Sequence, residues 1–454
     1  MINLRPSRIF AVALVILAAA TFAFAGGKTE STGAASSGPV TLQYDFWGDQ
    51  NEVNATEAYM AAYMKLHPEV KIDPLHIGAS TDFMAKITTL AASHSLPDLG
   101  YFIEPGVLPW GMNDQFVDLS NFYKSQPEKL SVLKFTTPDG KIVGVSVANE
   151  IHVIWYNKKL FDAAGLPYPP ADPSKAWDWN HFVHVAKLLT KDTNGNNATS
   201  ANFDPHNTRQ FGAWIQQWYI PWITFAMSNG GGLVSQDGKQ LILNTPETID
   251  AIQKLADLIN VDHVSPTPGT NQMPSATASA LLSGQVAMSI DGTWSLQTIA
   301  ITHQQQGLDF GVGVLPYMKK LVTSSIGTPI VIYKTSKHIP QAEDLLKFVM
   351  NPENSLPLEK SGLWLPNEVQ WYKDPSLIAK WVDNPVHPPE YKQAVVDFAV
   401  NYAQRLPPYY VPTFQKMDDV IEPVLNKVWL GQESAANAIN NEIMPKITPI
   451  FEGK

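Results

Sequence analysis

The chain has 454 residues, of which 16% are charged and 44% are hydrophobic, and its formal net charge is −10 at pH 7. This length is enough for two domains with separate cores. An acidic chain without basic runs is a poor candidate for nucleic-acid binding. The lack of cysteine excludes disulfides, thiolate chemistry and a lipid anchor on cysteine.

Residues 1–25 are expected to be a cleavable signal peptide. An apolar run over residues 9–20 follows a positively charged start, and Ala23-Phe24-Ala25 is a small-x-small cleavage site. Residues 26–38, rich in Ser, Thr and Gly, are expected to form a flexible leader. No later segment offers about 18 consecutive apolar residues, so we expect a soluble periplasmic protein that is not a lipoprotein.

Predicted strands and helices alternate in the next part of the chain. The hydrophobic periodicity predicts strands over 40–47, 70–77 and 99–103 and helices over 51–66 and 82–93. Short turns between alternating elements favour a parallel α/β sheet. Ligands of such sheets bind beyond the carboxyl ends of the strands.

Four residues at these strand ends are candidate ligand contacts. Trp47, Asp49 and Gln50 follow the first strand, and the alternative role of Asp49 is to cap the next helix. Glu104 follows the third strand, and its alternative is a solvated loop acid. Rings beside planar polar groups suit a sugar, which presents both C–H faces and hydroxyls.

The middle of the chain is rich in tryptophan. Trp177 and Trp179 are interpreted as structural rings that pack on the helix that follows them. Trp214, Trp218 and Trp222 are spaced by four residues, which predicts one face of a helix that Pro221 would kink. Such a stripe is more typical of a core than of a ligand site, and only Trp218 is kept as a candidate contact.

No motif for catalysis, a metal or a cofactor is found. Residues 192–197 resemble the start of a calcium loop but lack its glycine and its final glutamate, so a polar turn is predicted. The sequence contains neither a zinc-hydrolase histidine pair nor a nucleophile elbow nor a phosphate-binding loop.

The segment from Ala278 to Trp294 has the most specific pattern. A short helix ends at Gly284, a residue suited to the left-handed conformation that ends helices, and an apolar strand follows over 286–290. Asp291-Gly292 then turns the chain into a new helix, with Trp294 in its first turn. This pattern resembles the signature of extracellular solute-binding proteins of bacterial ABC importers, in particular the sugar-binding family that includes maltose-binding protein.

Two further blocks carry the same resemblance, residues 156–166 (YNKKLFDAAGL) and residues 177–182 (WDWNHF). The resemblance implies a two-lobed α/β fold, the type II periplasmic binding-protein fold, with mixed sheets flanked by helices. Three hinge crossings are implied, near Asn149, Phe310 and Met350. The implied N-terminal lobe is 39–149 and 311–350, and the implied C-terminal lobe is 150–310 and 351–454.

The resemblance also implies ligand contacts. In the family, the Trp of Gly-x-Trp stacks on a sugar ring, which implies that role for Trp294, the alternative being a core ring. Asn149 and Glu150 fall in the first crossing, where the family often places a polar contact. Asp291 either accepts ligand hydroxyls or caps a helix, and Trp364 is either a second stacking ring or part of the core.

These observations predict binding without turnover and without a cofactor. The resemblance implies that a monomer captures a mono- or oligosaccharide in the periplasm by hinge closure and delivers it transiently to an ABC permease. Few basic residues fall near the candidate loops, which disfavours anions. The alternatives are a binding protein for a non-sugar neutral solute, a sensor component, or a secreted glycosidase or lyase. Such an enzyme would draw its paired carboxylates from Asp49, Glu104, Glu150 and Asp291.

Overall fold

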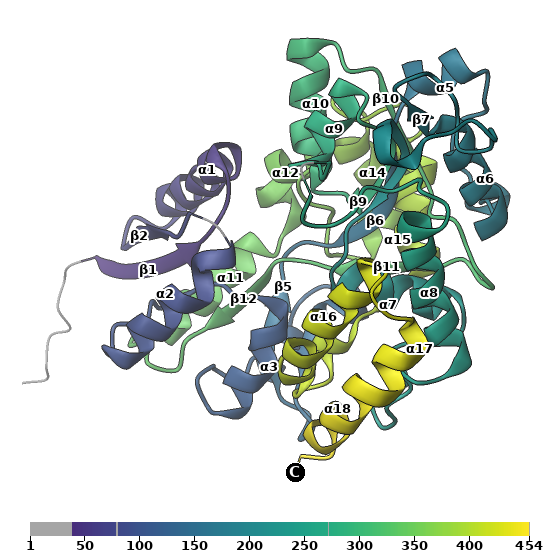
Figure 1. Cartoon of the computed structure of the whole chain (residues 1–454). Coiled ribbons are helices and arrows are strands. Elements are labelled where there is room, and N and C mark those ends of the chain that lie inside the picture. The colour runs from purple at the N-terminus through teal and green to yellow at the C-terminus, as the bar shows by residue number, and fades with distance from the viewer. Residues whose placement is uncertain (1–38, 79, 271, 454) are drawn as a thin grey trace, which may run out of the picture. The chain divides into compact units, whose positions relative to one another are not determined.

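The structure is a computed structural model that describes residues 39–78, 80–270 and 272–453. Its strands form two sheets, each flanked by helices (Figure 1). The expected signal peptide and leader lie outside the described residues. Within the described ranges, no helix combines the length and the apolar character that crossing a membrane requires.

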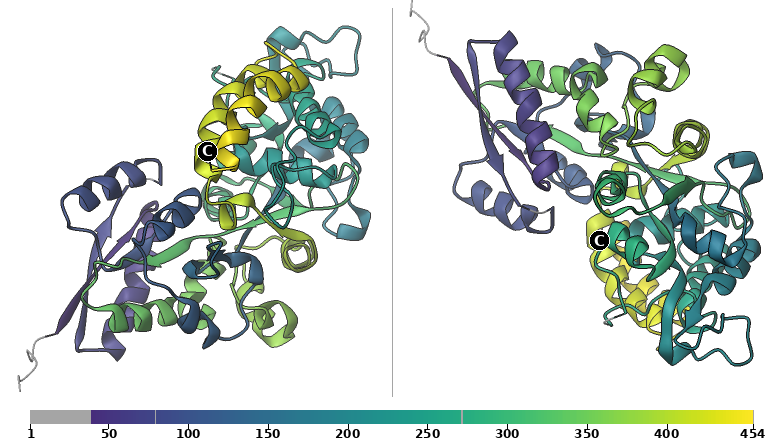
Figure 2. Two further views of the ribbon diagram at one scale, coloured as in Figure 1. Left: turned by 90° about the horizontal axis from the view of Figure 1, so that it is seen from below. Right: turned by 90° about the horizontal axis from the view of Figure 1, so that it is seen from above.

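The first sheet has six strands in the order β2-β1-β3-β12-β5-β4. Its strands are β1 (Val40–Phe46), β2 (Val70–His76), β3 (Leu99–Tyr101), β4 (Lys134–Thr136), β5 (Ile142–Ser146) and β12 (Pro329–Ile332). β1 pairs in parallel with β2 and β3, as the alternating pattern predicted, while β12 runs antiparallel to β3 and β5. Helices α1 (Gln50–Leu66) and α2 (Ser80–Ala92) cover opposite faces of β1 and β2 (Figures 1 and 2).

The second sheet is built around β6 and has the order β13-β11-β6-β9-β8-β7, with β10 also on β6. Its strands are β6 (Glu150–Asn157), β7 (Lys191–Asp192), β8 (Thr208–Ile215), β9 (Val286–Gly292), β10 (Phe310–Gly313), β11 (Thr323–Ile326) and β13 (Ala403–Arg405). Every residue of β6 and β9 is buried, as in strands that are covered on both faces.

The other α-helices are α3 (Glu104–Met112), α4 (Ser120–Lys124), α5 (Lys158–Ala164), α6 (Trp179–Leu189), α7 (Tyr219–Ser228), α8 (Pro246–Asn260), α9 (Thr277–Ser283), α10 (Ser295–Gln306), α11 (Ile339–Val349), α12 (Pro352–Lys360), α13 (Gln370–Lys373), α14 (Pro375–Val382), α15 (Phe398–Tyr402), α16 (Phe414–Trp429), α17 (Ala435–Asn437) and α18 (Met444–Phe451). Short 3₁₀ or π segments are η1 (Ser131–Leu133), η2 (Pro173–Lys175), η3 (Pro205–Asn207), η4 (Lys392–Asp397), η5 (Pro407–Tyr409) and η6 (Ala438–Ile443).

The chain returns to the first sheet later than the sequence indicated. It leaves that sheet between β5 and β6, close to Asn149 as expected, but β10 and β11 then pair with β6 in the second sheet. Residues 311–326 therefore add strands to the second sheet, and β12 is the strand that returns to the first. Leu358 and Trp364, which follow the expected crossing near Met350, are buried with the first sheet's core.

The predicted helical stripe of tryptophans is wrong. Trp214 lies in β8, Trp218 precedes α7, and Trp222 lies inside α7. Pro221 falls in the first turn of α7, where a missing backbone N–H costs no helical hydrogen bond, so it causes no kink. The three tryptophans, although spaced by four residues, thus lie in a strand, in a turn and in a helix.

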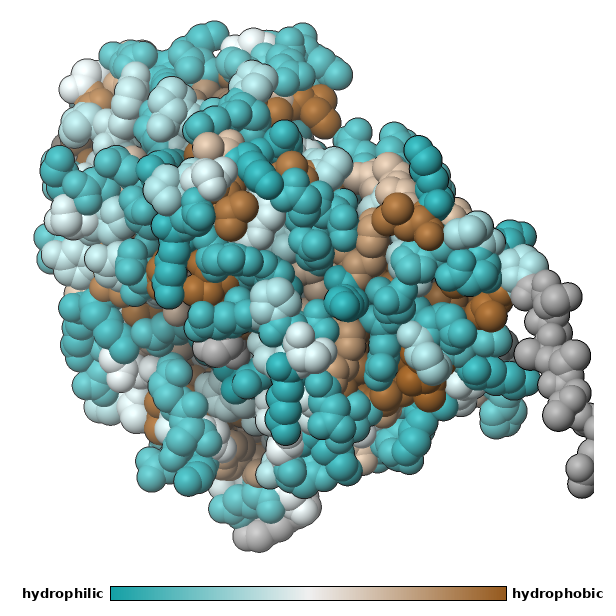
Figure 3. Space-filling model, turned by 180° about the vertical axis from the view of Figure 1, so that it is seen from behind, coloured by the Kyte–Doolittle hydropathy of each residue, from teal (hydrophilic) through white to brown (hydrophobic). Residues whose placement is uncertain are grey.

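Apolar side chains are mostly enclosed in two buried clusters. On the face drawn in Figure 3, hydrophilic residues predominate and apolar residues appear in small groups. The large apolar residues that remain exposed are Leu66, Met112, Tyr168, Val261, Val400 and Leu430. They come from separate elements, as is usual for a protein surface.

Candidate functional site

A cavity of about 580 Å³ is lined by elements of both sheets. This volume lies within the range of about 300–1,000 Å³ that is typical of ligand pockets. Its lining residues are Trp47, Glu52, Ser80, Ile103, Glu104, Pro105, Glu150, Gln216, Trp218, Tyr219, Trp294, Ile326, Gly327, Thr328, Leu363 and Trp364. The structure therefore brings together six of the ten candidate residues.

Trp47 forms the wall on the side of the first sheet. It follows β1 directly, and its ring stands edge to face against Tyr101 and Phe83, each with a centroid separation of 5.0 Å. These contacts hold the ring in one orientation while part of it stays exposed to the cavity. A fixed, partly exposed ring of this kind can stack on a ligand without losing much conformational freedom.

Trp218 and Trp294 form the wall on the side of the second sheet. Each occupies the position just before a helix, α7 and α10 respectively, and each is partly exposed. The Trp294 ring also stands edge to face against the buried His152, at 5.3 Å between centroids. Burial lowers the pKa of His152 to about 3, so this ring is neutral at physiological pH and supports Trp294 by packing.

Trp364 also lines the cavity, but its ring is only 1% exposed. It packs in the core of the first sheet, 6.4 Å from Tyr101 between centroids. This placement matches the alternative role considered for it, because a ring so fully enclosed offers little face for stacking.

Three carboxyl side chains face the same cavity and influence each other. Burial raises the pKa of Glu104 to about 7, partly offset by the backbone amides of Glu104 and Gly327. Burial and the charge of Asp49 raise the pKa of Glu52 to about 8. The pKa of Glu150 is raised by burial and then by the charges of Glu104 and Glu52. Like charges in a poorly solvated site oppose ionisation, so a negative charge on Glu104 or Glu52 makes Glu150 harder to ionise.

Two of the candidates near the first strand lie outside the cavity lining. The Asp49 carboxylate accepts hydrogen bonds from the backbone N–H groups of Asn51, at 2.8 Å, and Glu52, at 3.1 Å, and so caps α1. Gln50 is exposed and donates to Asn54 Oδ1 at 2.9 Å. The capping alternative thus describes the place of Asp49 in the fold.

Asn149 and Asp291 are buried in hydrogen-bond networks of the fold. Asn149 donates to the Tyr372 hydroxyl at 3.1 Å and accepts from Ser325 Oγ at 2.6 Å, which ties the first crossing to neighbouring segments. Asp291 Oδ2 accepts from Thr277 Oγ1 at 2.5 Å and from Ser295 Oγ at 2.6 Å. Neither residue lines the main cavity, and Asp291 accepts from side-chain hydroxyls and from the backbone N–H of Gly292 rather than from the free amides of α10.

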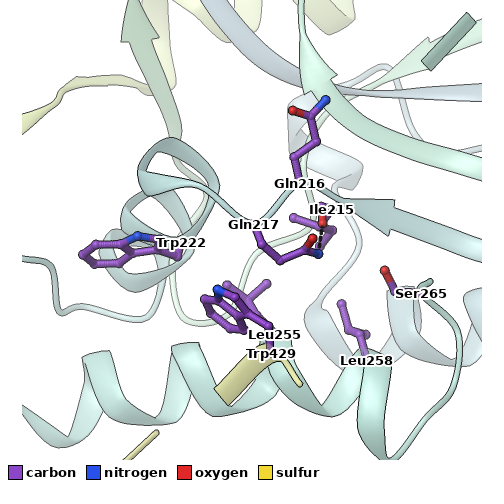
Figure 4. Close-up of a pocket in the computed structure, with 8 residues that line it drawn as sticks. All are labelled: Ile215, Gln216, Gln217, Trp222, Leu255, Leu258, Ser265 and Trp429. Atoms are coloured by element: carbon purple, nitrogen blue, oxygen red, sulfur yellow. Dashed lines mark hydrogen bonds between the residues drawn. The ribbon is translucent and has the colours of Figure 1, made fainter. Parts of the chain in front are cut away.

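A second cavity of about 530 Å³ adjoins the main one. The two share Gln216, Trp218 and Trp294 in their linings, and Asp291 lines the second. By contrast, the cavity in Figure 4 measures about 10 Å³ and lies among Ile215, Trp222, Trp429 and their neighbours. That space suits about one water molecule, so it belongs to the packing of the core.

The sequence analysis missed Glu52 and Tyr219, which also line the main cavity. Glu52 lies three residues after Asp49, a spacing typical of a capping box with no ligand role. Its carboxylate folds back against Gly48, where an added Cβ would lie 2.4 Å from Glu52 Oε2. Gly48 has φ +144°, a conformation that favours glycine, and it makes room for this packing.

The expected polar turn at residue 192 is present. Both carboxylate oxygens of Asp192 accept hydrogen bonds from within the loop, including the backbone N–H of Asn194 and of Asn196, each at 2.9 Å. Among residues 39–453, with the two gaps noted above, no group of three or more His, Cys, Asp or Glu side chains is placed to hold a metal ion.

Known proteins similar in sequence include periplasmic binding proteins. The sn-glycerol-3-phosphate-binding periplasmic protein UgpB of Rhizobium meliloti is 22% identical over 336 residues, which cover 72% of this chain and 69% of that protein. UgpB of Agrobacterium fabrum is 28% identical over 189 residues, 41% of this chain. That match spans only 38% of the Agrobacterium protein.

Solved structures of similar fold include an ABC substrate-binding protein of Listeria monocytogenes in complex with cycloalternan. Its TM-score is 0.75 and its sequence identity is 22%, and the match covers 91% of this chain and 99% of that one. The GacH receptor of Streptomyces glaucescens, solved unliganded and with acarbose, has a TM-score of 0.73 and 18% identity over 91% and 99%. These likenesses confirm the two-lobed fold. The family model for bacterial extracellular solute-binding proteins matches residues 47–355, and this chain belongs to that family.

Proposed function

We propose that the protein is the substrate-binding component of an ABC importer and that it binds a carbohydrate in the main cavity. The observation that carries this proposal is the set of partly exposed rings, Trp47, Trp218 and Trp294, around a cavity that also contains carboxyl groups. Indole faces stack on the C–H faces of a sugar, and carboxyl oxygens accept hydrogen bonds from its hydroxyls.

A phosphorylated ligand such as glycerol 3-phosphate is the second candidate, because it gives the UgpB relatives their name. The charge of the site disfavours it. Within the described ranges, the cavity lining includes no Lys, Arg or His, while it includes three glutamates. A phosphate bound there would lack the charge-assisted hydrogen bonds that usually hold it. The cycloalternan and acarbose complexes of the structural relatives support a sugar instead.

Binding would close the lobes about the two segments at which the strands change sheet, residues 147–149 and 327–328. Glu150 directly follows the first segment, and Gly327 and Thr328 form the second, and all three line the cavity. A ligand that contacts both lobes favours the closed form by its additional contacts. We place residues 39–146 and the β12 region in the N-terminal lobe, and β6 to β11 in the C-terminal lobe.

The remaining parts of the proposal follow from the family. The protein would be exported through its N-terminal signal peptide, act as a monomer in the periplasm, and present the closed form to a membrane permease. A sensor role would use the same cavity with a different membrane partner.

A sugar panel tests the proposal. The purified protein, lacking residues 1–25, is screened against neutral mono- and oligosaccharides, amino sugars and glycerol 3-phosphate by thermal shift, because a tight ligand raises the melting temperature by mass action. Hits are titrated by calorimetry, and each mixture is analysed for products. We expect one-to-one sugar binding with no product. Steady product formation would indicate a glycosidase or lyase, and a response to glycerol 3-phosphate alone would contradict the carbohydrate assignment.

A further inference from the structure

The side chains that line the main cavity include acidic groups, and among the described residues they include no basic ones. Glu52, Glu104 and Glu150 line it, and none of its lining residues in the described ranges is basic. The guanidinium of Arg405 is in the same region, but it donates hydrogen bonds to the carbonyl oxygens of Lys134 and Tyr409 and is absent from the lining. The protein itself therefore supplies no counter-charge inside the cavity.

Glu150 is the member of this group that most clearly lacks a partner. It is the first residue of β6 and only 9% exposed, and it lines the cavity. No donor among the described residues forms a hydrogen bond or ion pair with its carboxylate. A buried carboxyl group without a partner costs free energy unless something else satisfies it. A bound ligand that donates to Glu150 would remove this cost.

The aromatic walls suit the same kind of ligand. Trp47, Trp218 and Trp294 are the partly exposed indoles of the cavity, and an indole attracts a cation over its face. An ammonium group also donates up to three hydrogen bonds and accepts none, which complements carboxylates that only accept. A neutral sugar satisfies the rings but supplies no positive charge to a carboxylate of the cavity.

We propose that the natural ligand is a carbohydrate bearing a protonated amine, and that Glu150, with Glu104 and Glu52 beside it, binds the ammonium group. This inference rests on the proposed function, because it names the chemical class of the sugar. The raised pKa values of the carboxyls mean that the empty cavity keeps protons near neutral pH. An ammonium group replaces these protons when it binds.

Other titratable groups around the three carboxyls do not change this expectation. Tyr101, Tyr59 and Asp49 lie beside Glu52, Tyr219 beside Glu104, and Tyr409 beside both Glu104 and Glu150. Burial raises the pKa of each of these tyrosines above its usual value, so they stay neutral below pH 9. The glutamates are thus the groups of the cavity that must give up protons when an ammonium group binds.

The test compares matched sugars by calorimetry at pH 7. Glucosamine, galactosamine and glucosamine oligomers of about two to four units are each titrated beside the neutral and the N-acetylated sugar of the same size and linkage. We expect each binding amino sugar to bind at least about 10-fold more tightly than its uncharged counterparts, the scale of one charge-assisted contact. Its affinity should rise from pH 5 to pH 7, because binding of the ammonium group releases protons from the glutamates, and the affinity of the counterparts should not rise.

Two variants assign the effect to the cavity. Glu150→Gln keeps the shape of the side chain but removes its charge, and it should abolish most of the preference for the amine. If Glu150→Gln does not fold, Glu104→Gln serves the same purpose. Glu57→Gln makes the same charge change on the exposed face of α1 and should leave the preference intact. Equal or tighter binding of neutral sugars would overturn this inference and leave the proposed function standing. Failure of every sugar to bind would overturn both.

Discussion

Trp218 and Trp294 meet edge to face, with ring centroids 6.4 Å apart and ring planes at 74°. The two rings are separated by a long stretch of sequence and are brought together by the starts of α7 and α10. Both line the main cavity and its neighbour, so a ligand that extends from one cavity into the other passes this pair. The pair is therefore the natural centre of the proposed sugar site.

Replacing Trp294 by alanine should weaken sugar binding by about 1–3 kcal/mol, the scale of one buried ring, while unfolding stays cooperative. Calorimetry with the best sugar of the panel measures the loss. Trp177→Ala is the matched control, because Trp177 is also partly buried but lies away from the cavity lining. Equal affinity of Trp294→Ala and the unaltered protein would leave Trp294 with a packing role only.

Asp49→Ala should lower the free energy of unfolding by about 1 kcal/mol, because it removes the cap of α1. The affinity for a neutral sugar should change by less than about 2-fold, since Asp49 does not line the cavity and 2-fold is well below the effect of a direct contact. Asp49→Ser retains a capping oxygen and should recover most of the stability. A large loss of affinity without a loss of stability would restore the ligand role first considered for Asp49.

We expect substitution of one partner in the buried ion pair of Lys129 and Glu368 to lower stability strongly. Lys129 Nζ lies 2.6 Å from Glu368 Oε1 and also donates to the Met350 carbonyl oxygen at 2.8 Å. Lys129→Met leaves a buried carboxylate without its partner, so we expect a loss of about 3–5 kcal/mol in urea unfolding.

The double variant Lys129→Met/Glu368→Gln should lose less than Lys129→Met alone, because no unpaired charge remains. Lys141→Met, in the exposed pair with Asp139, should leave the free energy of unfolding nearly unchanged, because solvent screens that pair. A double variant as unstable as the sum of its single variants would show that the two residues are not coupled.

We expect the buried carboxyl group of Glu359 to make the free energy of unfolding depend on pH. It is fully buried, and burial raises its pKa from 4.5 to about 8, although Ser355 Oγ donates to it at 2.8 Å. Between these values the folded state holds a proton that the unfolded state has lost. The free energy of unfolding should therefore fall as pH rises, by up to about 1.4 kcal/mol per pH unit for this group.

Glu359→Gln should make this decline shallower when urea unfolding is measured between pH 5 and pH 8, whereas Glu57→Gln should not. The comparison isolates Glu359 from the other carboxyls with raised pKa values, since those are present in both variants. An unchanged slope in Glu359→Gln would mean that its carboxyl is solvated in the folded state.

The sequence predicted those elements whose pattern is local. The periodicity of residues 40–103 predicted strands β1, β2 and β3 of the first sheet with helices α1 and α2, and Gly284 ends α9 in the left-handed conformation, with φ 72°. Pairing between distant strands leaves no local pattern. That is why the return to the first sheet was expected near Phe310, whereas β10 and β11 pair with β6 in the second sheet.

The candidate site was predicted in part for the same reason. Trp47 follows a strand, so the rule that ligands bind at strand ends predicted its place beside the cavity, while the family resemblance implied that of Trp294. Asp49 and Asp291 also follow or end strands, but hydrogen bonds within the fold occupy them. Glu52 was missed because its burial depends on the close approach of Gly48, which only the folded backbone reveals.

The central claim is that the rings of the main cavity bind a carbohydrate. Its most direct test is calorimetric titration of the best sugar of the panel into the unaltered protein and into the double variant Trp218→Ala/Trp294→Ala. We expect one-to-one binding by the unaltered protein and at least about 100-fold weaker binding by the double variant, as the loss of two stacked rings implies. Sugar binding of equal strength in both proteins would contradict the account.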